Sequence, residues 1–239
     1  DVVLCPGSRN AALAIALRDG TAALSKCYFA PGSVGLAVDG PGKVVASECA
    51  LGPHYAAVRV TRPAGGDPAG NTELTLTHCS ALLPLGGSLI ELGDRVPCLI
   101  RAALCLIAGP DRSAMDDLPT VLRQRKERAA ETRYEADPDA APNGYYNVAA
   151  YAEGDTTYTF ADAARERLPV KDVERPLKHP WDDPDPFAAL AAKPPEPRRA
   201  FKPNLRLPDL RVKGDRAGVN DYKTSMNLHL SLVSTFAAL

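Results

Sequence analysis

The sequence predicts an α+β fold: a Gly/Pro-punctuated, antiparallel β-rich core with a few helices, then a long extended Pro-rich arm and a C-terminal strand. Three observations predict it. Short apolar runs alternate with Gly and Pro turn signals between residues 21 and 93, as in hairpin-connected strands. Residues 169–208 hold ten of the 22 prolines. Residues 226–232 alternate strictly between apolar and polar side chains.

These boundaries divide the chain into three parts. Residues 1–165 are the mixed α+β globular part, residues 166–225 the extended arm, and residues 226–239 a terminal strand that pairs with its own or a neighbouring sheet. A chain of 239 residues with 45% apolar content can bury a sizeable core.

The N-terminal stretch predicts a strand, a turn and a helix. Residues 2–5 are a short apolar run, and Pro6 and Gly7 signal a turn. Ser8 can cap a helix over residues 9–19, which are rich in Ala and Leu.

The same stretch, DVVLCPGSRNAAL, resembles the opening of the pyrimidine-binding domain in the thiamine-diphosphate enzyme family of menaquinone synthesis. The resemblance covers about the first 20 residues and implies an enzyme-derived cofactor-binding fold. In that family a glutamate on the next strand activates the cofactor, and residues 28–33 hold no acid. No catalytic or cofactor-binding residue is therefore assigned.

Between residues 21 and 93 we expect short strands. Residues 43–47, 55–61, 73–78 and 88–92 are the predicted strands, and residues 73–78 alternate cleanly. Frequent turns between them indicate an antiparallel sheet, sandwich or barrel.

Two helices are predicted next. Residues 98–108 are apolar and long enough for a buried helix, although a strand is possible. Asp117 can cap a second helix over residues 117–134, with Pro119 in its first turn. The basic side chains of this second segment indicate a solvated helix face or, alternatively, contact with a phosphate-rich or acidic partner. Residues 145–151 and 156–158 are predicted strands, and a short helix ends at Pro169.

Proline fixes φ and removes a backbone donor, so the arm is expected to run extended, with at most short helical inserts such as residues 187–193. Large apolar side chains along it are predicted interaction anchors, and a solvated linker is the alternative. These anchors are Trp181, Phe187, Leu190, Phe201, Leu205, Leu207 and Leu210. In the terminal strand the predicted interacting residues are Met226, Leu228, Leu230 and Leu232.

Charge, hydropathy and cysteine content limit the classes of partner and the cellular compartment that we expect. A net charge of −1, from 28 basic and 29 acidic residues, disfavours nucleic acid as a sequence-specific partner bound by a basic face. No apolar run is long enough to span a membrane. The six cysteines all lie in the first 105 residues, form no C-x-x-C pair and follow no secretory signal. They predict reduced thiols in the cytoplasm or in a particle assembled in the cytosol.

No metal ligand, cofactor or catalytic residue is predicted. Four scattered histidines have no zinc spacing. The acidic residues 182–185 lack the glycine and distal glutamate of a calcium loop. There is no G-x-S-x-G elbow and no P-loop.

These observations favour a structural protein over an enzyme. The predicted function is a subunit of a large assembly, such as the capsid of a virion or another multi-subunit complex, with protein subunits as partners. The arm and the terminal strand would tie it to its neighbours. The alternatives are the enzyme-derived cofactor-binding fold and a peptide-binding adaptor with a Pro-rich ligand tail at residues 194–199.

Overall fold

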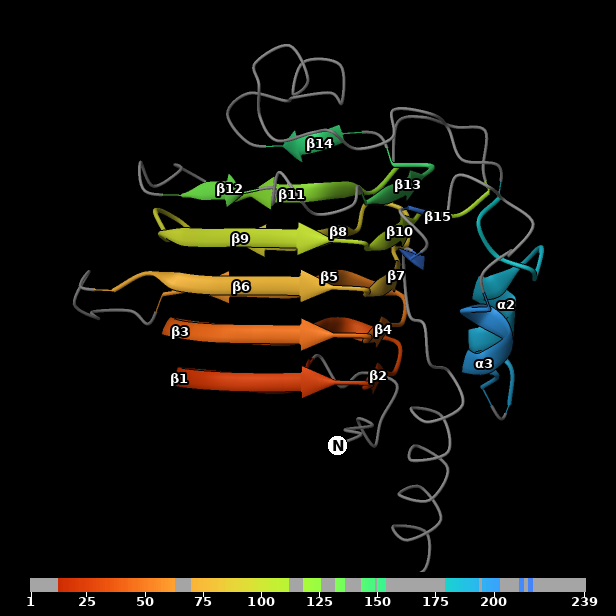
Figure 1. Ribbon diagram of the computed structural model, residues 1–239, viewed down its shortest axis with the longest axis horizontal. Coiled ribbons are helices and arrows are strands. Elements are labelled where there is room, and N and C mark those ends of the chain that lie inside the picture. Colours follow the sequence, from red (N-terminus) through yellow and green to blue (C-terminus); the bar gives the residue numbers. More distant parts are fainter. Residues whose placement is uncertain are drawn as a thin grey trace, which may run out of the picture.

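The computed structural model describes residues 13–62, 70–111, 118–125, 132–135, 143–148, 150–153, 179–193, 195–202, 211–212 and 215–216. In this part of the chain the strands coil into a parallel β-solenoid, with successive turns of the coil stacked on one another (Figure 1). The expected antiparallel α+β core is therefore wrong. Within the solenoid every strand pairing is parallel.

The strands of the solenoid are β1 (Leu13–Ser25), β2 (Tyr28–Phe29), β3 (Gly32–Ser47), β4 (Ala50–Leu51), β5 (His54–Thr61), β6 (Thr72–Thr77), β7 (Ser80–Leu82), β8 (Ser88–Leu92), β9 (Cys98–Ala103), β10 (Leu106–Ala108), β11 (Thr120–Gln124), β12 (Arg133–Glu135), β13 (Gly144–Tyr146) and β14 (Ala150–Glu153). The helices α2 (Pro186–Ala191) and α3 (Pro197–Ala200) follow, and then the antiparallel pair β15 (Arg211–Val212) and β16 (Asp215–Arg216).

The solenoid has three stacks of strands. The front stack holds the second halves of β1 and β3, followed by β6, β9 and β12. The short stack holds β2, β4, β7, β10 and β13. The third stack holds the first halves of β1 and β3, followed by β5, β8, β11 and β14. Because β3 runs through two stacks, the front and third stacks form one continuous sheet.

The corner between the front stack and the short stack has the same backbone turn in four successive rungs. Lys26, Glu48, His78 and Leu104 all have φ between 53° and 57°, a left-handed conformation that side-chain-bearing residues adopt rarely. The amides of the first three donate to carbonyls of the next rung at 2.9–3.0 Å. Lys26, Glu48 and His78 are therefore each held in this conformation by the rung stacked on them.

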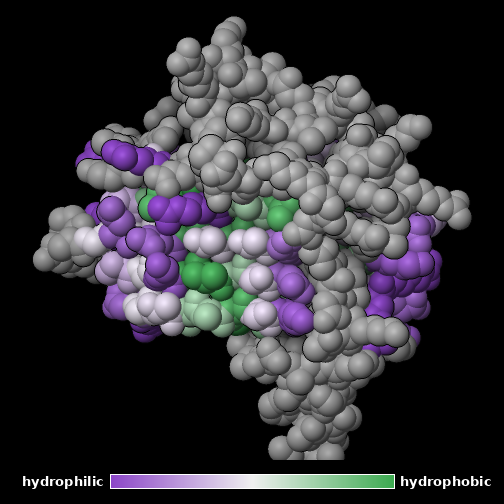
Figure 2. Space-filling model, in the orientation of Figure 1, coloured by the Kyte–Doolittle hydropathy of each residue, from purple (hydrophilic) through white to green (hydrophobic). Residues whose placement is uncertain are grey.

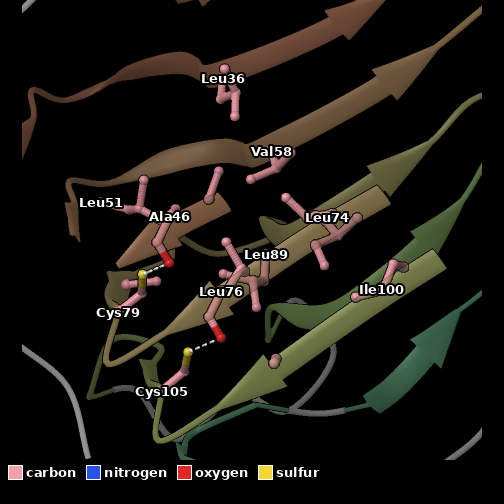
Figure 3. Packing of buried hydrophobic residues seen from close by; sticks show 14 of the residues in the cluster. Leu36, Ala46, Leu51, Val58, Leu74, Leu76, Cys79, Leu89, Ile100 and Cys105 are labelled. Atoms are coloured by element: carbon pink, nitrogen blue, oxygen red, sulfur yellow. Dashed lines mark hydrogen bonds between the residues drawn. The ribbon is translucent and has the colours of Figure 1, made fainter. Parts of the chain in front are cut away.

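A cysteine follows each of these left-handed residues, so Cys27, Cys49, Cys79 and Cys105 form a buried column. The thiols of the last three lie 3.5–3.7 Å from carbonyl oxygens of the preceding rung, and Figure 3 shows two of these contacts. Asn143 occupies the next place in the column. Its Nδ2 donates to Ala102 O at 3.1 Å, and its Oδ1 accepts from the Cys105 amide at 2.8 Å.

The core lies inside the coil and consists of apolar columns that run from rung to rung. In the front stack Val44, Leu74 and Ile100 are in register and fully buried. Leu36, Val58 and Ile90 form a matching column in the third stack. Each column buries apolar surface at every rung, so the main stabilisation of the fold grows with the number of stacked rungs.

The segment 179–202 packs outside the coil, over the short stack (Figure 1). Trp181, Leu190 and Phe201 are buried in one cluster with Tyr28 and Leu106 of the short stack. The ring of Phe201 lies edge-on to those of Tyr28 and Trp181, at centroid distances of 6.1 and 5.7 Å. We call this segment the lid. The short helix predicted within residues 187–193 is present in the lid as α2, Pro186–Ala191.

Two further helix predictions are wrong where the structure describes the residues. In the first, residues 13–19 belong to β1, because Ile15 and Leu17 align with Leu36 and Val38 and extend their columns. In the second, residues 120–124 and 133–135 are β11 and β12. Tertiary stacking outweighs the modest helix preference of Ala, Leu, Arg and Glu. Residues 98–108 form the strands β9 and β10, the alternative to a helix.

Burial of the cysteine column predicts that its thiols are unreactive in the native protein. Burial raises the pKa of Cys98, outside the column, to about 12. At Cys49, contact with Cys27 lowers the pKa, but contact with Cys79 and burial outweigh this and raise it to about 12. Because the thiolate is the nucleophile, we expect the five described cysteines to resist iodoacetamide at pH 8 and to react in guanidinium. Peptide mass spectrometry would measure this, and rapid native labelling of Cys79 would contradict the stacked core.

Candidate interaction surface

The outward side of the front stack, which we call the front face, presents three columns of side chains. The middle column is Ala23, Val45, Thr75 and Arg101. One flanking column is Thr21, Lys43, Glu73, Leu99 and Arg133, and the other is Ser25, Ser47, Thr77 and Ala103. The columns arise because side chains alternate between the two sides of a strand and the rungs are in register.

Small side chains occupy most of the middle of this face, and charged ones lie beside them. Lys43 and Glu73 form an ion pair at 3.2 Å between neighbouring rungs, and their side chains are 55% and 39% exposed. At the opposite margin Lys26 Nζ lies 3.9 Å from Glu48 Oε2. Figure 2 shows hydrophobic colour in the middle of the face and hydrophilic colour on both sides.

This arrangement matches the anatomy of a protein interface. Protein interfaces have a centre that is more apolar and depleted in Lys, Glu and Asp, and a polar rim. A flat face of this kind suits contact with another flat surface, since complementary shapes exclude water over the whole area. The front face is therefore the candidate interaction surface.

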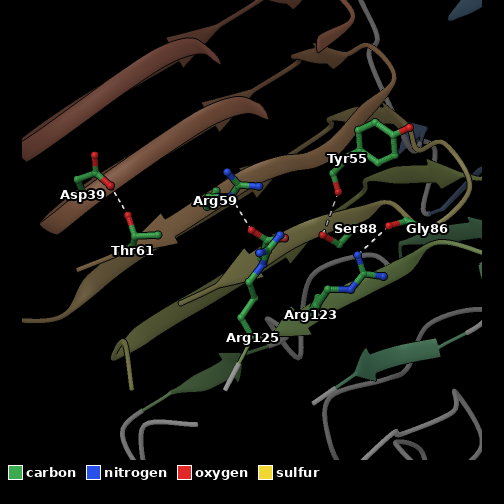
Figure 4. Close-up of polar contacts among 9 residues, drawn as sticks. Asp39, Tyr55, Arg59, Thr61, Gly86, Ser88, Arg123 and Arg125 are labelled. Atoms are coloured by element: carbon green, nitrogen blue, oxygen red, sulfur yellow. Dashed lines mark hydrogen bonds and ion pairs between the residues drawn. The ribbon is translucent and has the colours of Figure 1, made fainter. Parts of the chain in front are cut away.

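The third stack carries a charged row on its outward side. Arg59, Glu91 and Arg123 are in register, and Glu91 is only 3% exposed. Its two carboxylate oxygens bind Arg59 Nε and Arg125 Nη2. Arg123 Nη1 donates to Gly86 O at 2.7 Å, and the Thr61 hydroxyl donates to Asp39 (Figure 4). Because guanidinium groups neutralise Glu91, this row fastens neighbouring rungs together.

The lid is attached to the solenoid by a polar cluster at its beginning. His179 Nε2 lies 3.6 Å from Asp111 Oδ2, and its ring packs edge-on against Tyr146 at 5.5 Å. The Tyr146 hydroxyl also donates to Asp111. Burial, followed by the Asp111 contact, raises the pKa of Tyr146 to about 12. The tyrosine therefore stays a neutral donor across the physiological pH range.

The residues predicted as interaction sites have three different placements. Trp181, Leu190 and Phe201 are buried against the chain's own short stack, and Phe187 is half-buried beside them. Leu205, Leu207 and Leu210 lie outside the described residues. So do all four predicted residues of the terminal strand, Met226, Leu228, Leu230 and Leu232. Of these residues, the four that the structure describes lie in the lid and not on the front face.

The sequence reasoning missed the residues of the front face. Lys43 and Glu73 are separated by 30 positions and become neighbours only through the rung register. A signal was present in the recurring tripeptides Ser-Lys-Cys, Ser-Glu-Cys, Thr-His-Cys and Ala-Leu-Cys, at residues 25–27, 47–49, 77–79 and 103–105. Aligning these tripeptides gives the observed register of the front stack.

Three comparisons with known proteins found no matching family model, no matching curated protein and no matching solved structure. The fold defines the class: the described residues form a parallel β-solenoid with a lid over one stack. Within those residues no helix is long and apolar enough to cross a membrane. The same residues contain no group of three or more His, Cys, Asp or Glu side chains that could hold a metal ion.

Glu91 gives a direct test of the charged row. We expect Glu91→Ala to lower the free energy of unfolding by about 2 kcal/mol, because it leaves the guanidinium of Arg59 without its buried partner. Arg125→Ala removes the other guanidinium of the same carboxylate, whose side chain is 60% exposed, and should cost under about 1 kcal/mol. Urea denaturation measures both values. If both variants lost the same free energy of unfolding, burial of the Glu91 carboxylate would contribute nothing to stability.

His54 predicts a pH dependence of stability. It is buried, and its Nε2 donates to Ala30 O at 2.8 Å. Its ring packs against Gly35, at a place where a Cβ atom would come within 3.3 Å of the imidazole. Burial lowers its pKa to about 4, against the opposing effect of nearby carbonyls. The neutral form is therefore the native one. Its stability contribution is complete above pH ~6.5, the ordinary histidine pKa, and is lost as pH falls towards 4.

We expect the wild type to lose on the order of 3 kcal/mol more than His54→Gln between pH 7 and pH 4, since a pKa unit corresponds to about 1.4 kcal/mol. Comparing the two proteins cancels the titration of Asp and Glu. Urea denaturation at both pH values measures the difference. Parallel pH profiles would contradict the buried neutral histidine.

Proposed function

We propose that this chain is a structural subunit of a protein assembly and that its front face is a subunit contact. The observation that carries the proposal is the composition of that face. Val45 and Thr75 lie in its centre, and the exposed pair Lys43–Glu73 lies at its margin. That combination resembles the centre and rim of protein interfaces.

The terminal segment supplies a second contact in this proposal. Met226, Leu228, Leu230 and Leu232 alternate with polar residues, which suits addition to the edge of a neighbouring sheet. Partners are protein subunits, identical or different. We also propose that the cysteine thiols are reduced and that the protein is in the cytoplasm or in a particle assembled in the cytosol. The sequence contains no paired-cysteine motif, which supports this proposal. A virion capsid is one assembly of this kind.

The lid changes how the terminal contact must be tested. Removing everything after residue 168 would expose Tyr28 and Leu106, which the lid covers. A deletion beginning at residue 217 leaves the lid and the strands β15 and β16 in place. Any loss of association in that variant then reports on residues 217–239.

We expect the full chain to form oligomers in size-exclusion chromatography with light scattering at about 10–100 µM, the range of modest interfaces. Deleting residues 217–239 should lower the mean mass without unfolding the protein, as checked by circular dichroism. A full chain that stays monomeric over this range would overturn the proposed function. An unchanged mass after the deletion would remove the terminal segment from it.

A further inference from the structure

We infer that the front face binds the front face of a second copy of this chain, related by a two-fold axis that runs parallel to the strands. This inference rests on the proposed function and names its partner and geometry. A two-fold contact uses the same patch on both subunits, so the patch must be complementary to itself. The columns of the front face can be tested for that property residue by residue.

The axis lies between the rungs of Lys43 and Glu73. Rotation about it keeps each column facing itself but reverses the order of the rungs. Lys43 of the first copy then faces Glu73 of the second copy, and Glu73 of the first copy faces Lys43 of the second. Both are exposed and already approach each other at 3.2 Å within one chain, so the two copies together form a four-charge network of alternating sign at the rim.

The same rotation gives compatible neighbours in the other columns. In the middle column Val45 faces Thr75 of the second copy, and Ala23 faces its Arg101. Ser47 faces Thr77 in the remaining column, so two small hydroxyl-bearing side chains meet. No pair in these three columns brings like charges together. Val45 and Thr75 at the centre are not bulky, and the long side chain of Arg101, at the end of the middle column, meets only the small Ala23.

The other face-to-face two-fold arrangement is less favourable. An axis parallel to the stack would keep the rung order and place each middle-column residue opposite its own copy. Arg101 would then face Arg101, and Lys43 would face Ser47. Like charges directly opposite each other oppose association. Charge complementarity therefore selects the axis parallel to the strands.

The contact is small. Only the four rungs from β1 to β9 have a counterpart opposite them. Five residues per strand at about 3.3 Å and four rungs at about 4.8 Å give a contact of roughly 16 by 19 Å. Two such faces bury roughly 600 Å² in total, below the about 1,200 Å² at which stable specific interfaces begin, so the contact is weak and transient. The charges at its rim therefore contribute a large share of the affinity between the two copies.

Charge reversal tests this geometry in the full chain. Lys43→Glu places glutamate opposite glutamate at both equivalent contacts, and Glu73→Lys places lysine opposite lysine. We expect each variant alone to weaken association by at least about tenfold. An equimolar mixture of the two variants should regain it, because both rim carboxylates of the first variant then face lysines of the second. Light scattering at several concentrations measures the mean mass of each sample.

The mixture separates association from folding. Each variant also loses the ion pair within its own chain, which mixing cannot restore, so recovery in the mixture reports only on contact between chains. Lys193→Glu is the matched control, since Lys193 is an exposed lysine of the lid, away from the front face, and it should leave the mass unchanged. Circular dichroism checks that each variant is folded.

The outcomes distinguish this inference from the proposed function. A wild type that stays monomeric overturns both. A wild type that associates with the same affinity as Lys43→Glu overturns only the front-face contact, and self-assembly through other surfaces stands. Weakened variants that fail to recover on mixing overturn the two-fold geometry. Recovery on mixing, with the Lys193→Glu control unchanged, supports it.

Discussion

Register between rungs is the constraint on which the whole structure depends. A parallel strand satisfies its amides and carbonyls only through its neighbours, so each rung of the solenoid is a folded unit only when another rung lies on it. The left-handed turns at Lys26, Glu48 and His78 show this directly, because their amides bond to the next rung. Slipping the register by one residue would turn the inward column of Val44 and Leu74 outward and expose the core.

The lid follows from the same constraint. The inner sides of the short strands face the core, where Phe29 and Leu51 are buried. Their outer sides carry Tyr28 and Leu106, which need a second layer to remove them from water. Proline is compatible with that layer because Pro186 and Pro197 each occupy the first turn of a short helix, where the missing amide costs nothing. A proline-rich segment thus packs as a compact cover.

Local pattern was enough to predict several strands but not their arrangement. Residues 43–47, 55–61, 73–78 and 88–92 were predicted as strands and correspond to the second half of β3, β5, β6 and β8. Glycine and proline turns suggest hairpins, and here they mark corners between stacks. The columns of the parallel stacks join residues 21 to 38 positions apart with unequal spacing, so no fixed period reveals them. The recurring tripeptides ending in cysteine carried that information.

The candidate surface depends on register even more than the fold does. Each front-face strand contributes only two or three outward residues, and Lys43 is unremarkable until Glu73 lies beside it. A stacked face repeats similar side-chain positions along one direction, so a two-fold axis across the stack always superposes equivalent columns. Self-complementarity then requires only that charges alternate between rungs, and the Lys43–Glu73 pair that stabilises neighbouring rungs meets that requirement. The same alternation can therefore serve both folding and association.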